Sequence, residues 1–528
     1  MGTLIADGRE VTFTEEETLL EVFNKTGFKI PQMCFLAGLT PNGRCGLCTV
    51  ELQSAPDWVP ILACAIRPQE GMVVRTQSER ITMIRTLAAQ LLLRSHPCDC
   101  DYCEHFGDCE LRRVYNKTGF GFTRAIEDGK KQKPYLAPLS DRLLLDREKC
   151  TSCGLCVSFF REELGEDFVH FIREKNDHLR LERYPHTNTE NGYLLNAIEL
   201  CPCHALFDQQ ALSALPSWKL HTVSGISTES SAGNNIYLCA HDGEIAYVKP
   251  RPNSQVNRYI PDSVRSLYRD NDKNRIDKVL FHGQPIDLRE ALTKFLKMVG
   301  FGHRCAMVVR ASLSLESLFL IRQLADILGA PVFFKKHPQE GDSWLISKDA
   351  DTNVRGALLT RAIKKEQIED FQEIETLIDN RQIQTLIVLE NDLLAEGFPK
   401  KAFEKVESVI FASHKNTTTP YGHLIFPLTT VVEEDGHLIN QNFLLQRYHR
   451  ALIRPTEAQP LWQWLAMAKN SYLGNMGLQR EFQSIEAVWD ALSKSIPEFV
   501  TIDFAKIPDK GITIDGQRFT NFPFCDRE

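Results

Sequence analysis

The chain has 528 residues, of which 43% are hydrophobic and 25% are charged, as is usual for soluble globular proteins. Lys and Arg number 61 against 69 Asp and Glu, and the net charge of −8 gives no electrostatic reason to expect nucleic-acid binding. No apolar run approaches the roughly 18 residues of a membrane-spanning helix, and Asp7 and Glu10 stand where a signal peptide would be apolar. We therefore expect a soluble, unexported protein of several domains.

Residues 3–13 place short apolar stretches on either side of Asp7-Gly8, which predicts two short strands joined by a turn. Thr14, followed by three glutamates, has the composition of a helix start, and Gly27 that of a helix end. The sequence therefore predicts a strand pair and a helix ahead of the first cysteine.

Cysteine is concentrated in the front part of the chain. Thirteen of the 16 cysteines lie between Cys34 and Cys203, and the other three are isolated. Disulfides are rare in unexported proteins, so closely spaced cysteines indicate metal or redox chemistry. The sequence therefore predicts a metal-binding front part and a cysteine-poor rear part, joined near Pro216.

A first set of four cysteines has the spacing Cys34-x10-Cys45-x2-Cys48, followed by Cys64. Glycines stand between them, and a loop that points backbone N–H groups at cluster sulfurs needs the positive φ that glycine adopts. Four thiolates suit a plant-type [2Fe–2S] cluster, although the usual first spacing there is x4. They also suit a structural zinc ion, but the strand–strand–helix–loop order favours the ferredoxin-like cluster.

A second set of potential ligands lies in the stretch RSHPCDCDYCEHFGDCELRR, which holds four cysteines and two histidines: Cys98, Cys100, Cys103, Cys109, His96 and His105. Cys100-x2-Cys103-x5-Cys109 with one histidine would make a suitable set. A neutral imidazole in place of a thiolate makes a cluster less negative, which favours its reduced state. Spacing alone leaves a zinc site with three cysteines and one histidine equally open.

A third set begins with Cys150-x2-Cys153-x2-Cys156, the core of the bacterial [4Fe–4S] ferredoxin run. Zinc sites rarely use three ligands so tightly spaced. Cys201, followed by Pro202 as in that run, supplies a fourth thiolate, and Cys203 is interpreted as a spare buried thiol. Three ligand sets in one region predict a chain of one-electron centres that passes electrons along.

With these sets in this order, the sequence resembles the large iron–sulfur subunit of the peripheral arm of respiratory complex I, the G subunit of NADH:quinone oxidoreductase. The resemblance implies one [2Fe–2S] cluster and two [4Fe–4S] clusters, and leaves Cys98 and His105 out of the ligand sets. The implied ligands are Cys34, Cys45, Cys48 and Cys64 for the first cluster, His96, Cys100, Cys103 and Cys109 for the second, and Cys150, Cys153, Cys156 and Cys201 for the third.

The rear part resembles the molybdopterin-oxidoreductase-type domain that closes this family, through stretches near 242–253, 320–334 and 426–451. A helix and strand over 316–334, with buried strands at 384–391 and 407–412, predict an α/β parallel sheet. Some family members carry an extra cluster motif at the start of this domain, but here Cys239 stands alone. We therefore expect no fourth cluster, no molybdopterin and no catalytic residue, and interpret Cys305 as a buried core thiol.

These observations predict a multidomain protein of α+β and α/β class. The expected domains are a [2Fe–2S] ferredoxin-like (β-grasp) domain at 1–80, a His/Cys3 [4Fe–4S] domain at 81–140, a [4Fe–4S] ferredoxin-like domain at 141–216 and a degenerate molybdopterin-oxidoreductase-like domain at 217–528.

The resemblance implies an electron-relay subunit that takes electrons from NADH through a partner FMN subunit and passes them towards quinone. Its implied partners are the FMN subunit, a small [2Fe–2S] subunit and quinone-side subunits, at the cytoplasmic side of an inner membrane or the matrix side in an organelle. The same type of relay in an NAD-reducing hydrogenase or formate dehydrogenase, a catalytic molybdopterin enzyme, and a zinc-stabilised scaffold remain as alternatives.

Overall fold

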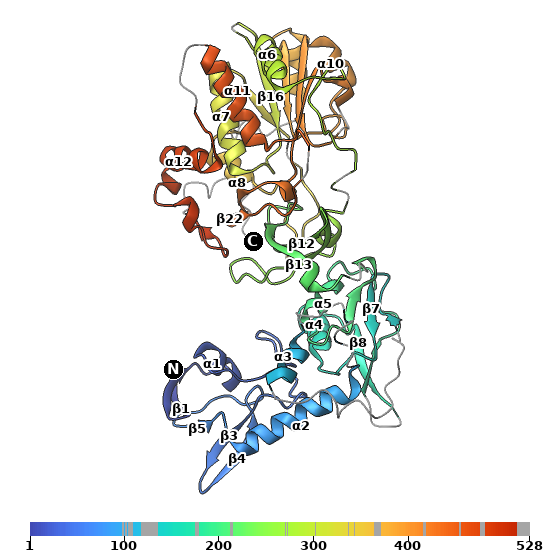
Figure 1. Cartoon of the computed structure of the whole chain (residues 1–528), viewed down its shortest axis with the longest axis vertical. Coiled ribbons are helices and arrows are strands. Elements are labelled where there is room, and N and C mark those ends of the chain that lie inside the picture. The colour runs from blue at the N-terminus through green and yellow to red at the C-terminus, as the bar shows by residue number, and fades with distance from the viewer. Residues whose placement is uncertain are drawn as a thin grey trace. The chain divides into compact units, whose positions relative to one another are not determined.

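The computed structural model divides into two compact units, Met1–Leu220 and His221–Glu528, and the division falls close to Pro216 (Figure 1). The residues that the structure describes are 1–97, 100, 103, 109–117, 136–174, 179–211, 215–269, 271, 273–300, 302–335, 337–342, 344–363, 371–415, 419–453, 456–475 and 481–514. Cys98, His105 and Cys525 lie outside them. No helix within the described part of the chain is long and apolar enough to cross a membrane.

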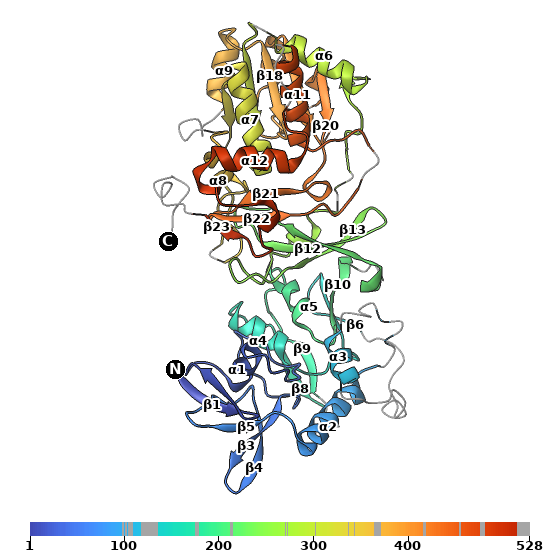
Figure 2. The same cartoon turned by 60° about the vertical axis from the view of Figure 1, so that its left-hand side comes forward.

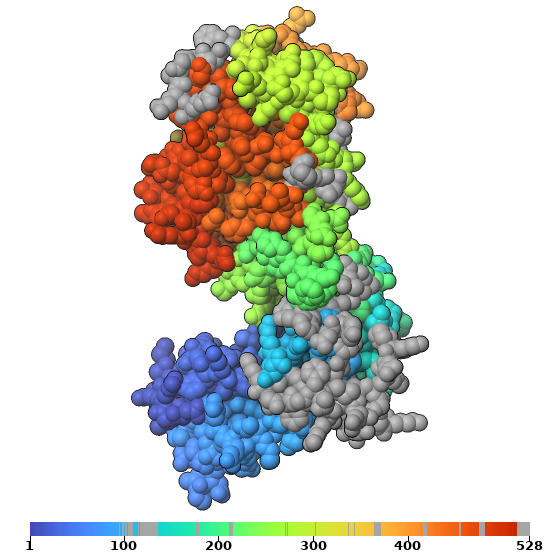
Figure 3. Space-filling view, in the orientation of Figure 1, coloured from blue at the N-terminus to red at the C-terminus, as the bar shows by residue number. Residues whose placement is uncertain are grey.

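The front unit begins with a five-stranded sheet of order β2-β1-β5-β3-β4, whose part of the surface runs from dark to lighter blue in Figure 3. The predicted strand pair is confirmed, because the first two strands pair antiparallel around Asp7-Gly8. One helix packs its apolar face on this sheet through Leu19, Leu20, Val22 and Phe23. The elements are β1 (Gly2–Ala6), β2 (Arg9–Phe13), α1 (Leu19–Lys25), β3 (Thr49–Ser54), β4 (Asp57–Leu62) and β5 (Val73–Arg75).

The predicted start of α1 at Thr14 is wrong, because the helix begins at Leu19 with Thr18 as its N-cap. The Thr18 hydroxyl accepts a hydrogen bond from the Glu21 N–H at 3.3 Å, and the Glu21 carboxylate accepts one from the Thr18 N–H at 2.8 Å. This reciprocal capping box satisfies two backbone donors at once and outcompetes a start at Thr14, whose hydroxyl instead donates to Glu17.

The next helix, α2 (Glu79–Ser95), connects the sheet to the second set of ligands. Ser78 caps its start by accepting from the Ile81 N–H at 3.0 Å. The Arg85 guanidinium donates to the Thr49 carbonyl at 2.7 Å, which attaches the helix to β3. The shorter α3 (Glu110–Lys117) follows the last cysteine of that set.

The rest of the front unit packs short elements around the third set of ligands. A three-stranded sheet of order β10-β7-β6 and a β8–β9 hairpin flank the contacting helices α4 and α5. Their bounds are β6 (Leu136–Pro138), β7 (Leu143–Asp146), α4 (Leu155–Glu162), β8 (Val169–Arg173), β9 (Leu179–Arg183), α5 (Ala197–Leu200) and β10 (Leu206–Asp208).

The rear unit starts with an antiparallel sheet of β11 (His221–Ile226), β12 (Asn235–His241) and β13 (Glu244–Pro250). Its centre is a seven-stranded sheet of order β15-β14-β20-β19-β18-β16-β17 (Figure 2). These strands are β14 (Leu280–Phe281), β15 (Gln284–Pro285), β16 (Cys305–Val309), β17 (Val332–Phe334), β18 (Thr385–Leu389), β19 (Ser408–Ser413) and β20 (Leu424–Pro427). Because β16 to β20 pair in parallel, the predicted α/β parallel sheet is confirmed.

Helices cover both faces of this sheet. One core contains residues of α6 (Leu288–Met298), α7 (Leu315–Leu328), α8 (Val354–Leu359), α11 (Leu461–Asn475) and α12 (Ile485–Ser495). The other contains residues of α9 (Gln372–Asp379) and α10 (Lys400–Lys405). A third sheet of β21 (Gly436–Ile439), β22 (Leu444–Tyr448) and β23 (Ile512–Thr513) completes the unit. The predicted helix and strand over 316–334 and the two buried strands are confirmed as α7, β17, β18 and β19.

Replacing Thr18 by Ala should remove the α1 N-cap and cost about 1 kcal/mol of local stability. Hydrogen–deuterium exchange of the α1 amides should then be about fivefold faster, because these amides exchange through local opening. Thr14→Ala is the matched control and should leave α1 exchange unchanged. Faster exchange in Thr14→Ala but not in Thr18→Ala would contradict the capping assignment.

Candidate metal centres

The first four predicted ligands are all buried, with exposed fractions of 1% for Cys34, 5% for Cys45, 2% for Cys48 and 0% for Cys64. Three of them lie in the loop between α1 and β3, and Cys64 follows β4. The backbone N–H of Cys45 donates to the Cys34 sulfur at 3.3 Å. An N–H aimed at sulfur is the contact that stabilises a cluster-bound thiolate.

The glycines of this loop take the conformation that the sequence predicted. Gly38, Gly43 and Gly46 have φ of 96°, 61° and 70°. A side chain at these positions would strain the backbone, since the left-handed region favours glycine. The glycines therefore let the loop curve around its cysteines and turn its N–H groups towards them.

The four sulfurs of the first set are arranged as two pairs. The hydrogen bond with the Cys45 thiol lowers the pKa of Cys34 to about 6, and the pKa of Cys45 is raised in return. Likewise the hydrogen bond between Cys48 and Cys64 raises the pKa of Cys48 and lowers that of Cys64. Two pairs of sulfurs meet the requirement of a two-iron cluster, in which each iron takes two protein ligands.

In the second set, His96 caps the C-terminus of α2 and is 7% exposed. Its Nδ1 lies 2.9 Å from the backbone oxygen of Lys149. A carbonyl oxygen only accepts, so Nδ1 carries the proton and Nε2 has the lone pair for a metal. Histidine ligands commonly hold their second ring nitrogen in this way.

The three cysteines of the second set are linked to one another locally. The Cys103 N–H donates to the Cys100 carbonyl at 3.2 Å. Burial raises the pKa of the Cys109 thiol, and the Cys203 thiol and then the Cys103 thiol add to this rise. The structure therefore relates these three cysteines to one another, and positions His96 through Lys149, the residue before Cys150.

All four predicted ligands of the third set line a single cavity. The empty space within it, including the part open to solvent, is about 310 Å³. Two residues of the loop beside the cavity have positive φ, 55° at Ser152 and 89° at Gly154. The Ala205 N–H donates to the Cys201 sulfur at 3.2 Å. The wall is formed by Leu145, Cys150, Thr151, Cys153, Gly154, Cys156, Phe171, Leu181, Cys201, Cys203, Ala205 and Leu206.

These thiols are hard to ionise without a bound cation. Burial raises the pKa of Cys150 to about 12, and raises the pKa values of Cys153 and Cys156 as well. Iron would reverse this preference, because a metal ion deprotonates the thiols that bind it. The donor set and the apolar wall of the cavity therefore fit a [4Fe–4S] cluster.

The predicted burial of Cys203 is confirmed, since this residue is 2% exposed, but the sequence did not show that it lines the cavity. Sequence reasoning set this residue aside as a spare thiol, but Cys203 lines the cavity together with the four predicted ligands. Its sulfur is 3.7 Å from that of Cys201. The Cys-x-Cys spacing over 201–203 indicated a second nearby thiol. Spacing alone could not show which of the two sulfurs faces the cavity.

The second and third sets are joined by two backbone segments. Lys149, next to Cys150, holds the imidazole of His96. Pro202, next to Cys201, accepts hydrogen bonds at its carbonyl from the Leu111 N–H at 3.4 Å and from the Cys109 thiol at 3.8 Å. Each of these segments contacts a ligand, or a neighbour of a ligand, in the other set. Such adjacency is what a relay of electrons between two clusters requires.

The rear unit contains only isolated cysteines among its described residues. Cys239 is 0% exposed within β12, and Cys305 is 4% exposed at the start of β16. Burial raises the pKa of Cys305 to about 11. Within the described part of the whole chain, no three His, Cys, Asp or Glu side chains are grouped to hold a single metal ion.

Comparison with known proteins identifies the first two cysteine regions. Residues 3–79 match the family model of a 2Fe-2S iron-sulfur cluster binding domain. Residues 85–124 match that of the NADH-ubiquinone oxidoreductase-G iron-sulfur binding region. The front unit therefore contains domains of the kinds that bind [2Fe–2S] and [4Fe–4S] clusters.

Curated relatives agree with these domains. The G subunit of NADH-quinone oxidoreductase from Rickettsia felis is 25% identical over 338 residues, covering 62% of this chain and 50% of the relative. The mitochondrial NADH-ubiquinone oxidoreductase 78 kDa subunit of Neurospora crassa is 27% identical over 336 residues, covering 62% of this chain and 45% of the relative. The chain thus spans about half the length of these relatives. The resemblance to this large iron–sulfur subunit is confirmed, since these homologues carry its bacterial name or the mitochondrial equivalent.

A solved structure, an NAD+-reducing [NiFe]-hydrogenase in the H2-reduced state, is 26% identical to this chain. The match covers 41% of this chain and 91% of that one, with a TM-score of 0.36. This score is too low for the likeness to bear on the fold or the function.

Proposed function

We propose that the chain is the iron–sulfur electron-relay subunit of a respiratory complex I-type assembly. It would take electrons from NADH through a partner FMN subunit and pass them one at a time towards quinone. The observation that carries this proposal is the convergence of cysteine sets within one compact unit, above all the cavity lined by Cys150, Cys153, Cys156 and Cys201. The names of the NADH-quinone and NADH-ubiquinone oxidoreductase relatives support the type of assembly.

The proposed cofactors are one [2Fe–2S] cluster and two [4Fe–4S] clusters. The buried sulfur pairs Cys34/Cys45 and Cys48/Cys64 support the first. The Nδ1–H of His96 supports ligation of the second cluster through Nε2, together with Cys100, Cys103 and Cys109. The five-cysteine cavity supports the third. Each bound cluster would accept and release one electron.

The chain's own residues would set how readily each cluster is reduced. Hydrogen bonds to sulfur and burial are the levers that proteins use for this purpose. The Cys45 N–H on Cys34 and the Ala205 N–H on Cys201 stabilise negative charge on those sulfurs. Both contacts therefore favour the reduced, more negative form of the cluster that each sulfur binds.

We further propose a division at 1–80, 81–140, 141–216 and 217–528. In the last of these, a degenerate molybdopterin-oxidoreductase-like domain would act as scaffold and partner surface, without a fourth cluster or a pterin. Its mostly parallel sheet with helices on both faces fits that fold class. Cys239 and Cys305 are single buried thiols in separate strands, which supports a structural role.

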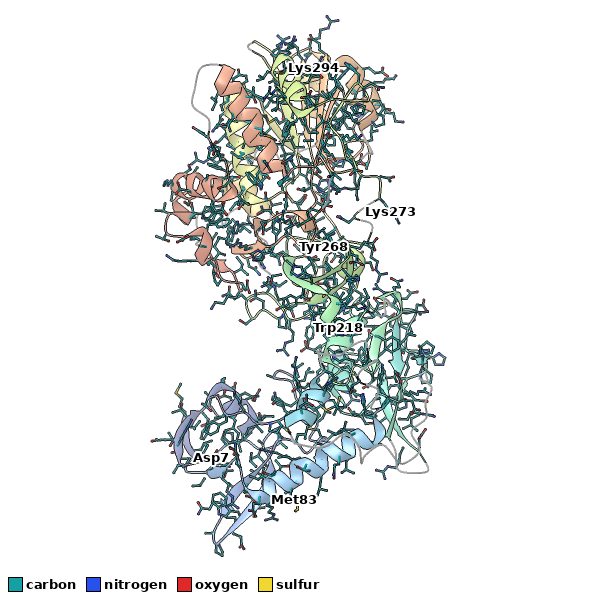
Figure 4. All side chains as sticks on the ribbon, viewed as in Figure 1. Asp7, Met83, Trp218, Tyr268, Lys273 and Lys294 are labelled. Carbon is teal, nitrogen blue, oxygen red and sulfur yellow. The ribbon has the colours of Figure 1, made fainter. Side chains whose placement is uncertain are left out.

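An exposed apolar stripe on α2 supports membership of a larger assembly. Met83, Leu87 and Leu91 are four residues apart on one face of the helix, with exposed fractions of 58%, 51% and 67%. Met83 is labelled on this helix in Figure 4. A continuous apolar stripe of this kind is typical of a surface that a partner covers. The assembly would contact a membrane through such partners, on the cytoplasmic or matrix side.

Anaerobic purification followed by iron, zinc and acid-labile sulfide analysis tests the proposal. One [2Fe–2S] and two [4Fe–4S] clusters require about 10 iron atoms per chain, with a similar amount of sulfide. A content of about 6 iron atoms would mean that one of the two four-iron sites is assigned wrongly. About 2–3 zinc ions per chain without sulfide would instead support a zinc-stabilised scaffold and reject the relay.

Replacing His96 by Cys should keep the second cluster and lower its reduction potential. A thiolate adds one negative charge where imidazole is neutral, and this disfavours the reduced state. Potentiometric EPR would measure the shift. His105→Ala is the matched control, because the resemblance leaves His105 out of the ligand set. An unchanged potential in His96→Cys at full iron content would exclude His96 as a ligand.

A further inference from the structure

The third cavity offers one more thiol than a [4Fe–4S] cluster uses. Each of the four iron atoms takes one protein ligand, yet Cys150, Cys153, Cys156, Cys201 and Cys203 all line the cavity. Cys203 is 2% exposed, so its side chain is buried in the wall of the cavity that the predicted ligands also line. A buried thiol at this place is a potential metal ligand.

Electrostatic interactions also place the Cys203 sulfur close to the other three. Burial is the main cause that raises the pKa values of Cys150 and Cys153, and the Cys203 thiol is the next largest in both cases. The same thiol contributes to the raised pKa of Cys156. Cys203 therefore shares its surroundings with every cysteine of the tightly spaced run.

Cys201 and Cys203 are close enough to reach one iron. Their sulfurs are 3.7 Å apart. The two sulfurs accept hydrogen bonds from different donors. The Ala205 N–H donates to Cys201 at 3.2 Å, and the Thr151 hydroxyl donates to Cys203 at 3.7 Å. Each sulfur thus has its own hydrogen-bond donor.

Resting on the proposed assignment of a [4Fe–4S] cluster to this cavity, we infer that Cys203 is an alternative ligand for the iron that Cys201 binds. In the exchange, the iron–sulfur bond to Cys201 breaks and one to Cys203 forms. The Cys203 thiol releases a proton, and the Cys201 thiolate takes one up. No electron is gained or lost, and the ligand charge on the cluster is unchanged.

Alanine variants of the full chain test the inference through iron and sulfide content and the EPR signals of the reduced clusters. Cys201→Ala and Cys203→Ala should each keep about 10 iron atoms, because one thiol of the pair remains. The double variant should fall to about 6. Cys153→Ala provides the control for loss of this cluster, and Cys239→Ala the control for removal of a buried cysteine elsewhere.

Loss of four iron atoms in Cys201→Ala alone would overturn the inference, as would full iron content in the double variant. A wild-type chain without iron and sulfide would instead reject the proposed function. Circular dichroism and the [2Fe–2S] signal check that each variant folds. If Cys201→Ala does not fold, Cys201→Ser replaces it. The double variant Cys201→Ser with Cys203→Ala then shows whether the serine or Cys203 binds the iron.

Thr151→Val adds a measurement, the reduction potential of the cluster, that would not change if Cys203 had only a structural role. In the Cys201→Ala background Cys203 should bind iron, so loss of the Thr151 hydroxyl should shift the reduction potential of the cluster. In the Cys203→Ala background the same change should have no effect, since the sulfur that this hydroxyl contacts is absent. Equal effects in both backgrounds would overturn the inference.

Discussion

Thiols buried together cannot all ionise unless positive charge is present among them. This constraint governs how the cysteines of the front unit are arranged. Cys153 and Cys203 line an apolar cavity. Burial raises the pKa of Cys153 far above its ordinary value, and the hydrogen bond with Cys201 together with burial does the same for Cys203. A metal centre removes this cost because it binds the thiolates directly. We therefore expect cluster loading to stabilise the fold.

The same constraint explains why irregular backbone surrounds the ligands. Helices and strands use their N–H groups internally, whereas loops can direct them at sulfur. The Cys34–Cys48 loop does so with the help of glycines at positive φ, as in the Cys45 N–H that donates to Cys34. In the turn before α4, the Ser152 backbone N–H donates to the Cys150 sulfur. Regular elements lie just outside these loops: Leu155 starts α4, and Cys201 directly follows α5. Helices thus hold the ends of the loops that carry the predicted ligands.

Much of this organisation could be predicted from local pattern. Strand pairing around Asp7-Gly8, the α7–β17 unit and the glycines of the first loop follow from residues near in sequence. Contacts between distant residues could not be predicted. The bond from His96 to Lys149 spans 53 residues, and spacing cannot show that Cys203 faces the cavity. The start of α1 was predicted at the wrong threonine because Thr14 and Thr18 are both followed three residues later by glutamate. Burial of Leu19 and Leu20 favours the start at Thr18.

In the rear unit, buried polar side chains pair with one another. His437 and Glu316 are 1% and 0% exposed with 2.5 Å between Nδ1 and Oε1, which links β21 to α7. The side chains of Arg275 and Glu433, each 2% exposed, are 2.7 Å apart. Removing either member of the Arg275–Glu433 pair would leave an uncompensated buried charge, at a cost of about 3–5 kcal/mol. Both carboxylates therefore have a side-chain partner within the unit. This contrast with the thiol cavity favours assigning the redox chemistry of the chain to the front unit.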